Sequence, residues 1–292
     1  MRSLLFIPGD DAKKLGKGAM SGADALILDL EDSVSLPRKA TAREHVAEYI
    51  RSAHGKGGPR LFVRINALDT GMADADLDAV MPAGPFGIML PKACGGRDVT
   101  HLGAKLAVRE AENGLDDGVT RILPIATEVA RAIFLMGTYA GASQRLCGIT
   151  WGAEDLAADI GAETNRMPDG GYSSPFLFAR NMCLLGAAAA GVPAVDTVYP
   201  DFRDEAGFST ETEQARRDGF TAKMAIHPAQ VAVINRIFTP APEAVANARA
   251  IIEAFAADPQ AGVIGINGKM LDRPHLRQAM RIIAQATAAG VV

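Results

Sequence analysis

The sequence predicts an α/β protein folded as a (β/α)₈ TIM barrel with a C-terminal helical lid extension. Eight short apolar runs recur along the chain, and helical patterns separate them. The runs are apolar without alternation, as strands buried on both faces are. A chain of 292 residues accommodates such a barrel, which takes about 250 residues, plus an appendage. A doubly wound open sheet is the structural alternative.

The predicted elements follow one another in strict β/α order. Ser35 and Pro37 precede a helical pattern that Gly55 can close. Ser174 begins another helical pattern, which ends at Gly191. The eight predicted strands are residues 3–8, 24–30, 60–65, 87–91, 121–127, 146–151, 194–199 and 222–227.

About a fifth of the chain remains after the eighth predicted strand. Residues 242–257 and 272–288 carry helical patterns, and residues 262–267 read as a short apolar turn or strand. We therefore expect two domains: a catalytic barrel over residues 1–228 and a helical extension over residues 229–292. Such a tail commonly serves as a lid or an oligomer contact.

Composition excludes several classes of protein. The net charge of −4 and the pI near 5.8 argue against a general nucleic-acid or anionic-membrane binder, which would carry basic excess. No apolar run reaches the roughly 18 residues that a membrane helix requires. The three scattered cysteines form no CxxC pair and suit reduced thiols. We expect a soluble cytoplasmic protein.

Charged residues follow most of the predicted strands. In a barrel the C-terminal strand ends meet at one face, which is where such enzymes keep their chemistry. So many charges on one face would repel or desolvate one another unless a metal and a charged ligand balanced them. The residues concerned are Glu31, Asp32, Arg64, Lys92, Glu128, Glu154, Asp155 and His227.

Glu128 and Asp155 are the candidate metal ligands. Taken alone, each fits equally an acidic residue in a first helical turn, stabilised by the macrodipole. Together, after neighbouring strands, they suit Mg²⁺, or alternatively Mn²⁺, because such an ion needs only one or two carboxylates and keeps positions open for substrate.

Arg64 lies in a run that would otherwise be a buried strand, where an unpaired guanidinium is costly. A structural ion pair with Glu31 or Asp32 is one interpretation. The functional one is a planar fork that binds a substrate carboxylate or an enolate-like oxygen. Glu31 and Asp32 then serve as acceptors that orient Arg64 or metal-bound waters near the substrate.

Three further positions have both a structural and a functional interpretation. Lys13 and Lys17 are solvated surface lysines by default, but they form the best patch for substrate phosphates. Asp272 precedes a helical pattern and fits an N-cap, although a tail folded over a neighbour could deliver it as an acid/base. His227 fits either a base or a structural histidine, and we do not include it in the catalytic set.

Several segments together resemble the citrate lyase beta-subunit-like branch of the HpcH/HpaI aldolase superfamily. Each segment alone is a weak signal, whereas their order and spacing are specific and cover nearly the whole chain. The segments are RSLLFIPG at 2–9, LDLEDSV at 28–34, VRIN at 63–66, LPK at 90–92, the Glu128 region, GAEDL at 152–156, IHP at 226–228 with Gln230, and GKMLD at 268–272.

The resemblance implies a TIM barrel with a C-terminal lid, assembled as trimers or multiples of trimers and acting on acyl-CoA thioesters. Glu128 and Asp155 match the Mg²⁺ ligands and Arg64 the substrate-binding arginine. Asp272 matches an acid/base that reaches into an adjacent subunit, and Lys13 and Lys17 would lie near the CoA nucleotide. The chain has Asn267 where relatives often have Asp, and Ala222 where glycine is common.

The expected activity is therefore Mg²⁺-dependent carbon–carbon lysis or condensation. A 3-hydroxyacyl-CoA such as malyl-, methylmalyl- or citramalyl-CoA would give an acyl-CoA and a 2-oxo acid. The alternatives are a CoA-independent metal-dependent 2-oxo acid aldolase, a malyl-CoA thioesterase and a non-catalytic metabolite-binding subunit. The long tail favours the CoA reaction over the aldolase.

Overall fold

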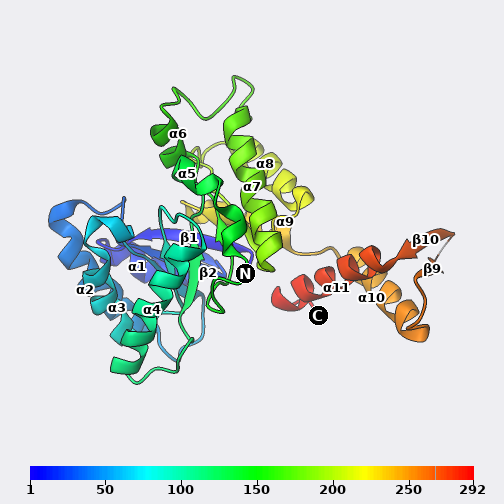
Figure 1. Cartoon of the computed structure of the whole chain (residues 1–292), viewed down its shortest axis with the longest axis horizontal. Coiled ribbons are helices and arrows are strands. Elements are labelled where there is room, and N and C mark those ends of the chain that lie inside the picture. The colour runs from blue at the N-terminus through cyan, green and yellow to red at the C-terminus, as the bar shows by residue number, and fades with distance from the viewer. Residues whose placement is uncertain (267) are drawn as a thin grey trace.

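Eight parallel strands form the centre of the computed structural model, which describes residues 1–266 and 268–292 (Figure 1). Their order around the sheet is β5-β4-β3-β2-β1-β8-β7-β6. Bridges between Ile122 and Leu146 and between Ile125 and Thr150 join the two ends of the sheet, so the barrel is closed. Closure confirms the TIM barrel and rules out the open sheet. The strands are β1 Ser3–Pro8, β2 Ala25–Asp29, β3 Arg60–Arg64, β4 Gly87–Leu90, β5 Arg121–Pro124, β6 Ile149–Thr150, β7 Ala194–Asp196 and β8 Ala222–Ala225.

Most strands end earlier than the sequence predicts. The apolar run predicted at 121–127 is strand only to Pro124, and the run at 194–199 is strand only to Asp196. Beyond Pro124 the pairing continues only as the isolated bridge between Ile125 and Thr150. Ile125 and, after β7, Thr197 and Val198 line the cavity at the mouth of the barrel, so these runs extend past the ends of their strands.

Two apolar layers hold the barrel together. Side chains that point inward, such as Leu4, Phe62 and Met89, fill its interior. Side chains that point outward pack beneath the surrounding helices. The helices are α1 Ala12–Gly18, α2 Lys39–Ala53, α3 Ala73–Val80, α4 Gly96–Glu112, α5 Ala130–Ile133, α6 Glu154–Ile160, α7 Ser174–Ala190, α8 Glu205–Asp218 and α9 Pro228–Phe238.

Helix boundaries follow local chemistry. Helix α7 begins at Ser174 with proline in its first turn and ends at Gly191, whose φ of 70° is the left-handed conformation that closes helices. Both ends agree with the sequence prediction. Helix α2 has its C-cap at His54, one residue before the predicted closing glycine.

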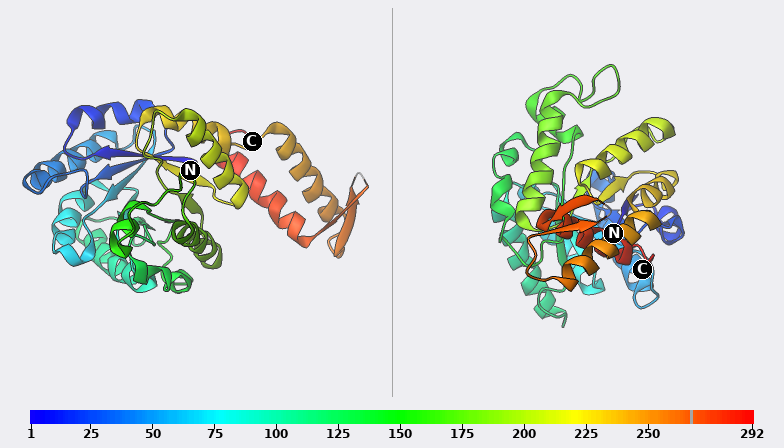
Figure 2. Two further views of the ribbon diagram at one scale, coloured as in Figure 1. Left: turned by 90° about the horizontal axis from the view of Figure 1, so that it is seen from above. Right: turned by 90° about the vertical axis from the view of Figure 1, so that its right-hand side faces the viewer.

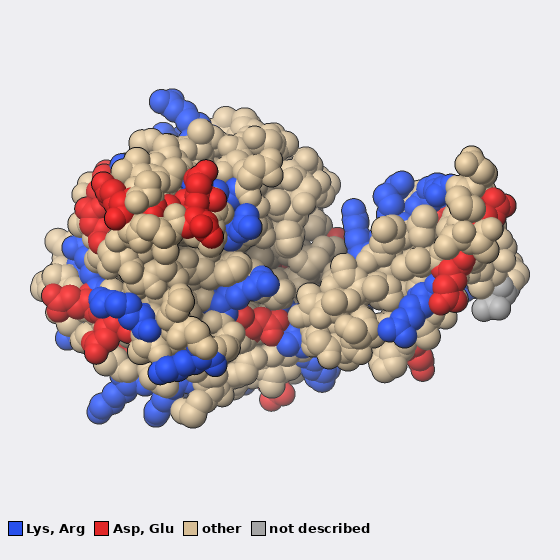
Figure 3. Space-filling model, turned by 90° about the horizontal axis from the view of Figure 1, so that it is seen from below, with Lys and Arg blue, Asp and Glu red and all other residues tan. Residues whose placement is uncertain are grey.

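The arm, residues 242–292, projects from the barrel (Figures 2 and 3). It consists of α10 Pro242–Ala257, the antiparallel pair β9 Val263–Ile266 and β10 Lys269–Asp272, and α11 Arg273–Ala288. Helices α10 and α11 pack on each other. Asn267 lies outside the described residues. The predicted helices at 242–257 and 272–288 are confirmed as α10 and α11.

Helix α9 lies against the barrel rather than with the arm. Its Asn235 accepts a hydrogen bond from the Ser3 hydroxyl at 2.7 Å, and Thr239, its C-cap, accepts one from Arg2 at 2.8 Å. The domain boundary at residue 228 stays a prediction, with α9 packed against β1 and β8.

Within the described residues, no helix combines the length and the apolar character needed to cross a membrane. Cys94, Cys147 and Cys183 are free thiols.

A buried ion pair between α4 and the segment before β6 supports the closed side of the barrel. Glu110 is fully buried and accepts two hydrogen bonds from Arg145, at 2.6 and 2.7 Å. We expect Glu110→Gln to lower the free energy of unfolding by roughly 3–5 kcal/mol at pH 7, because it removes the buried carboxylate from the guanidinium, which then keeps only the exposed Asp117 at 2.9 Å. Urea unfolding measures the change. Glu112→Gln, on the exposed face of the same helix, is the matched control and should change it little.

The loss in the free energy of unfolding caused by Glu110→Gln should depend on pH. Burial opposes ionisation of Glu110, but the hydrogen bonds from Arg145 and from the backbone N–H groups of Thr120 and Gly118 together outweigh it and lower the pKa from 4.5 to about 2. The pair therefore stabilises the fold fully above pH 4.5, and that contribution fades as the pH falls toward 2. The stability gap between wild type and Glu110→Gln should narrow over this interval; a constant gap would contradict the assignment.

Candidate functional site

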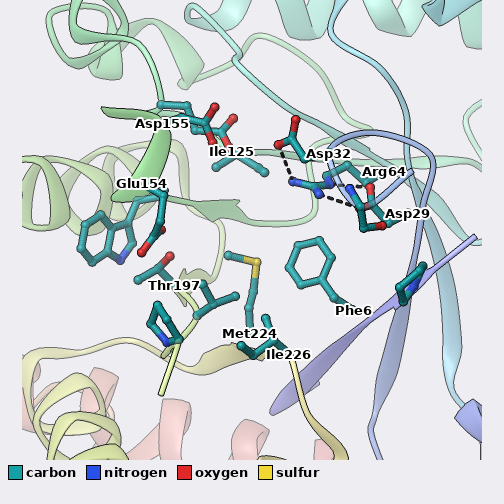
Figure 4. Close-up of a pocket in the computed structure, with 17 residues that line it drawn as sticks. Phe6, Asp29, Asp32, Arg64, Ile125, Glu154, Asp155, Thr197, Met224 and Ile226 are labelled. Atoms are coloured by element: carbon teal, nitrogen blue, oxygen red, sulfur yellow. Dashed lines mark hydrogen bonds and ion pairs between the residues drawn. The ribbon is translucent and has the colours of Figure 1, made fainter. Parts of the chain in front are cut away.

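A cavity of about 400 Å³ opens at the C-terminal ends of the strands. Most of the charged side chains occupy one side of it and most of the apolar side chains the other, where Glu154 also lies (Figure 4). The lining residues are Phe6, Pro8, Asp29, Asp32, Ser33, Arg64, Ile125, Glu128, Trp151, Gly152, Glu154, Asp155, Thr197, Val198, Pro200, Met224 and Ile226. The predicted site residues Asp32, Arg64, Glu128 and Asp155 are thus brought together.

Arg64 is held by Asp29 across two adjacent strands. The β2–β3 register places the two residues side by side, and both hydrogen bonds of the fork measure 2.7 Å. Against the cost of burial, this guanidinium keeps the pKa of Asp29 below its ordinary value. Arg64 also lies 3.1 Å from Glu31 and 3.6 Å from Asp32. Its main partner is therefore Asp29, whereas the sequence suggested Glu31 or Asp32.

Asp29 also shapes the loop after β2. Its two carboxylate oxygens accept hydrogen bonds from the backbone of Glu31 at 2.9 Å and of Ser33 at 3.2 Å. Lys39 donates to the carbonyl oxygens of Leu30 and Glu31 and closes the loop from outside. This explains why Glu31 is almost fully buried and faces the site.

Lys92 connects the two halves of the charged side. Its ammonium lies 2.6 Å from Glu31 and 3.2 Å from Asp155, and its backbone N–H donates to Glu128 at 2.6 Å. The side-chain contacts and the main-chain hydrogen bond of Lys92 form with its φ at 52°, a value that is unusual for a residue other than glycine. Such backbone strain is commonly retained at functional sites.

Glu128 and Asp155 lie close together on neighbouring segments. Glu128 follows β5 and is 4% exposed, while Asp155 stands in the first turn of α6 with its side chain one-third exposed. Burial, and then the negative charge of Asp155, raise the pKa of Glu128 to about 8. Burial likewise raises the pKa of Glu31 to about 7. The carboxylates therefore outnumber the cations that face them.

This arrangement fits a divalent cation. Glu128 and Asp155 are hard oxygen donors that crowd each other, and a cation between them would relieve their repulsion. Gly152 lets the Glu128 side chain pack closely against its backbone, because a Cβ there would come within 2.8 Å of the Glu128 Cγ. No group of three or more His, Cys, Asp or Glu side chains gathers to hold a metal among the described residues. Two protein ligands leave coordination positions free for substrate.

The other predicted residues lie away from the cavity. Lys13 and Lys17 are exposed on α1, and their role stays a prediction. Asp272 lies in the arm at the start of α11, where its carboxylate contacts His275 at 2.5 Å. His227 caps α9, accepting a hydrogen bond from Ala229, and stacks on Phe202, as a structural histidine does.

Sequence reasoning missed Asp29, and it placed Lys92 among the converging charged residues without assigning it a role. Asp29 is the last residue of a strand whose side chains would otherwise be apolar, a signal that could have identified it as the partner of Arg64. Lys92 stands at a predicted strand end, but nothing in the sequence shows the backbone turn that brings both its amide and its ammonium to the carboxylates.

Two family models and several known proteins are similar to this chain. The family model described as HpcH/HpaI aldolase/citrate lyase matches residues 2–228, and one described as a C–C bond lyase of the TIM-barrel fold matches residues 183–291. Citrate lyase subunit beta of Leuconostoc mesenteroides subsp. cremoris is 36% identical, over 100% of this chain and 95% of the relative. Mitochondrial citramalyl-CoA lyase of Mus musculus is 33% identical, over 98% and 86%.

A solved structure is similar over the full length. The crystal structure of CitE from Mycobacterium tuberculosis in complex with magnesium, acetoacetate and coenzyme A has a TM-score of 0.75 and 32% identity, and the match covers 98% of each chain.

The close approach at Gly152 can be tested without any ligand. We expect Gly152→Ala to lower the free energy of unfolding by about 1–3 kcal/mol, because the new methyl group would press on a buried glutamate. Gly137→Ala is the matched control, since nothing lies within 4 Å of its Cβ position. Chemical denaturation of both variants checks the prediction, and equal stabilities would show that the space beside Glu128 is not tight.

Proposed function

The chain belongs to the HpcH/HpaI aldolase/citrate lyase family, and from this premise we propose that it is a Mg²⁺-dependent lyase of 3-hydroxyacyl-CoA thioesters. The reaction yields an acyl-CoA and a 2-oxo acid, or runs in reverse. The observation that carries the proposal is the meeting of Glu128, Asp155 and Arg64 at one cavity, in a fold whose solved relative holds magnesium and coenzyme A.

Glu128 and Asp155 would hold the ion, with Mn²⁺ as an alternative. When bound, it supplies a Lewis acid for the oxygen atoms of the 2-oxo acid. Lys92 keeps both carboxylates in place, through its amide to Glu128 and its ammonium beside Asp155. Glu128 and Gly152 both line the cavity where the oxo acid would lie.

Arg64 would bind the thioester oxygen. Its five N–H groups are not exhausted by the two bonds to Asp29 and the contact with Glu31. As the carbon–carbon bond breaks, negative charge develops on that oxygen as an enolate, and a guanidinium already held in position stabilises it at little reorganisation cost. The stacking of Arg64 on Phe6, 4.9 Å away, further fixes its plane.

Asp272 would handle the proton at the α-carbon of the thioester. In cleavage it would supply a proton to the enolate carbon, and in condensation it would remove one. A hydrogen bond from His275 lowers its pKa, which favours the carboxylate that condensation needs. Asp272 lies in the arm, away from the cavity of its own chain, so we propose that it serves a neighbouring subunit of a trimer or hexamer.

The surface of the arm supports this assembly. Met270 is 77% exposed, Met280 57% and Val263 50%, although apolar side chains are normally buried. An arm that covers a neighbouring barrel would shield these residues and keep water from the enolate. Lys13 and Lys17, at the start of the chain, would lie near the CoA nucleotide.

An assay with Mg²⁺ and a panel of 3-hydroxyacyl-CoAs, following 2-oxo acid and free thiol separately, tests the reaction. We expect oxo acid without thiol, and Asp155→Asn should reduce the rate at least about a hundredfold by removing a metal ligand. The control Asp116→Asn, on the exposed loop before β5, should match wild type. Thiol alone would indicate a thioesterase, turnover only of CoA-free hydroxy-oxo acids an aldolase, and no turnover a binding subunit.

The origin of Asp272 can be tested by subunit mixing. We expect Asp155→Asn and Asp272→Asn chains each to be inactive alone but to regain activity when they are co-expressed. A mixed assembly then contains sites at which the barrel of one chain and the arm of its neighbour are both intact. The doubly substituted chain is the control and should stay inactive. A mixed assembly without activity would contradict delivery of the carboxylate from another subunit.

A further inference from the structure

The apolar side of the cavity limits which 2-oxo acid the site can release. This inference rests on the proposed function. This apolar wall consists of Phe6, Val198, Met224 and Ile226, whereas Ile125 lies beside Asp155 (Figure 4). The wall faces the charged side across the cavity (Figure 4). The relatives named for citrate lyase and for citramalyl-CoA lyase match at 36% and 33% identity, so similarity does not choose the substrate.

Most of the apolar wall is built into the barrel. Met224 is 3% exposed on β8, and the Thr150 hydroxyl contacts its sulfur at 3.8 Å. Met224 belongs to the packed interior of the barrel, and Phe6 and Val198 pack against that interior, so this part of the wall has little room to move. Ile226, at the outer edge of the wall, is 41% exposed.

The charges that line the cavity would repel a second carboxylate on the substrate. Among the described residues that line the cavity, Arg64 is the only Lys or Arg, and Asp29 already engages it. Five carboxylates line the same cavity. One of them, Glu154, lies on the side of Met224 and Thr197, where it would repel another anion (Figure 4).

The carbon that bears the hydroxyl group is tetrahedral, and this geometry directs one of its substituents toward the apolar wall. That carbon bears a hydroxyl, a carboxylate, the bond to the acyl-CoA and one variable group. The first two face the edge formed by Glu128 and Asp155, and the acyl part faces Arg64. The four bonds of a tetrahedral carbon diverge, so the variable group points to the remaining side, which is the apolar wall.

We infer that the variable group is uncharged, a hydrogen or a short alkyl chain, and that the 2-oxo acid carries a single carboxylate. The site should release a glyoxylate- or pyruvate-like acid rather than an oxaloacetate-like one. A second carboxylate would lose its hydration against Met224 and Val198 without gaining a cation. An alkyl group of similar length would gain from the same contacts.

Two measurements on the wild-type protein with Mg²⁺ test this inference. In cleavage, kcat/KM for citramalyl-CoA should exceed that for citryl-CoA by about a hundredfold or more. In calorimetry, 2-oxobutyrate should bind at least about tenfold more tightly than oxaloacetate, which has a carboxylate in place of a methyl group. Comparable values for the two substrates, or tighter binding of oxaloacetate, would overturn the inference and leave the lyase reaction standing.

A charge placed on the wall should reverse the preference. Met224→Lys would give the second carboxylate a cation, so the ratio of citryl-CoA to citramalyl-CoA turnover should rise at least about tenfold. Met20→Lys, the same change at a side chain 80% exposed outside the barrel, should leave the ratio unchanged. If Met224→Lys does not fold, the wild-type ratios still decide. Turnover of no 3-hydroxyacyl-CoA, malyl-CoA included, would overturn the proposed function, and this inference with it.

Discussion

The ion pair between Asp29 and Arg64 is the interaction on which the rest of the site depends. A guanidinium at the end of a barrel strand must be neutralised, and the carboxylate at the same level of the next strand does this with two short hydrogen bonds. The same carboxylate binds the backbone of the following loop and thereby aims Glu31 at Lys92. Lys92 in turn reaches the carboxylates after β5 and β6. One pair thus fixes a chain of charges across half of the barrel.

Barrel closure makes this chain of charges possible. Strands β5 and β6 are the two ends of the sheet, and only the bridges between them bring Glu128 beside the segment that carries Asp155. The interior of the barrel below the site is apolar and closely packed, so the charged groups cannot relax downward. Their mutual repulsion is therefore stored in the fold until a cation and an anionic ligand balance it.

The sequence predicted the barrel, its helical extension and the convergence of Arg64, Glu128 and Asp155, because each of these follows from apolar runs and from what stands at their ends. It could not identify Asp29 as the partner of Arg64, since that choice depends on the β2–β3 register. It could not assign a role to Lys92, because a positive φ at a lysine leaves no trace in composition or spacing. Strand ends were also misplaced, because the apolar runs at 121–127 and 194–199 continue beyond the last residues of β5 and β7.

Lys92 uses both its main chain and its side chain, and this restricts which residues evolution can place there. Glycine would adopt the same φ with less strain but would remove the ammonium between Glu31 and Asp155. Arginine would keep a positive charge, yet its wider planar head would not occupy the space of a compact ammonium. Asparagine tolerates the left-handed turn and is neutral. Homologous chains that lack lysine at this position should therefore have changed the acidic residues around it as well, so paired variation at positions 31, 92 and 155 would mark members with altered chemistry.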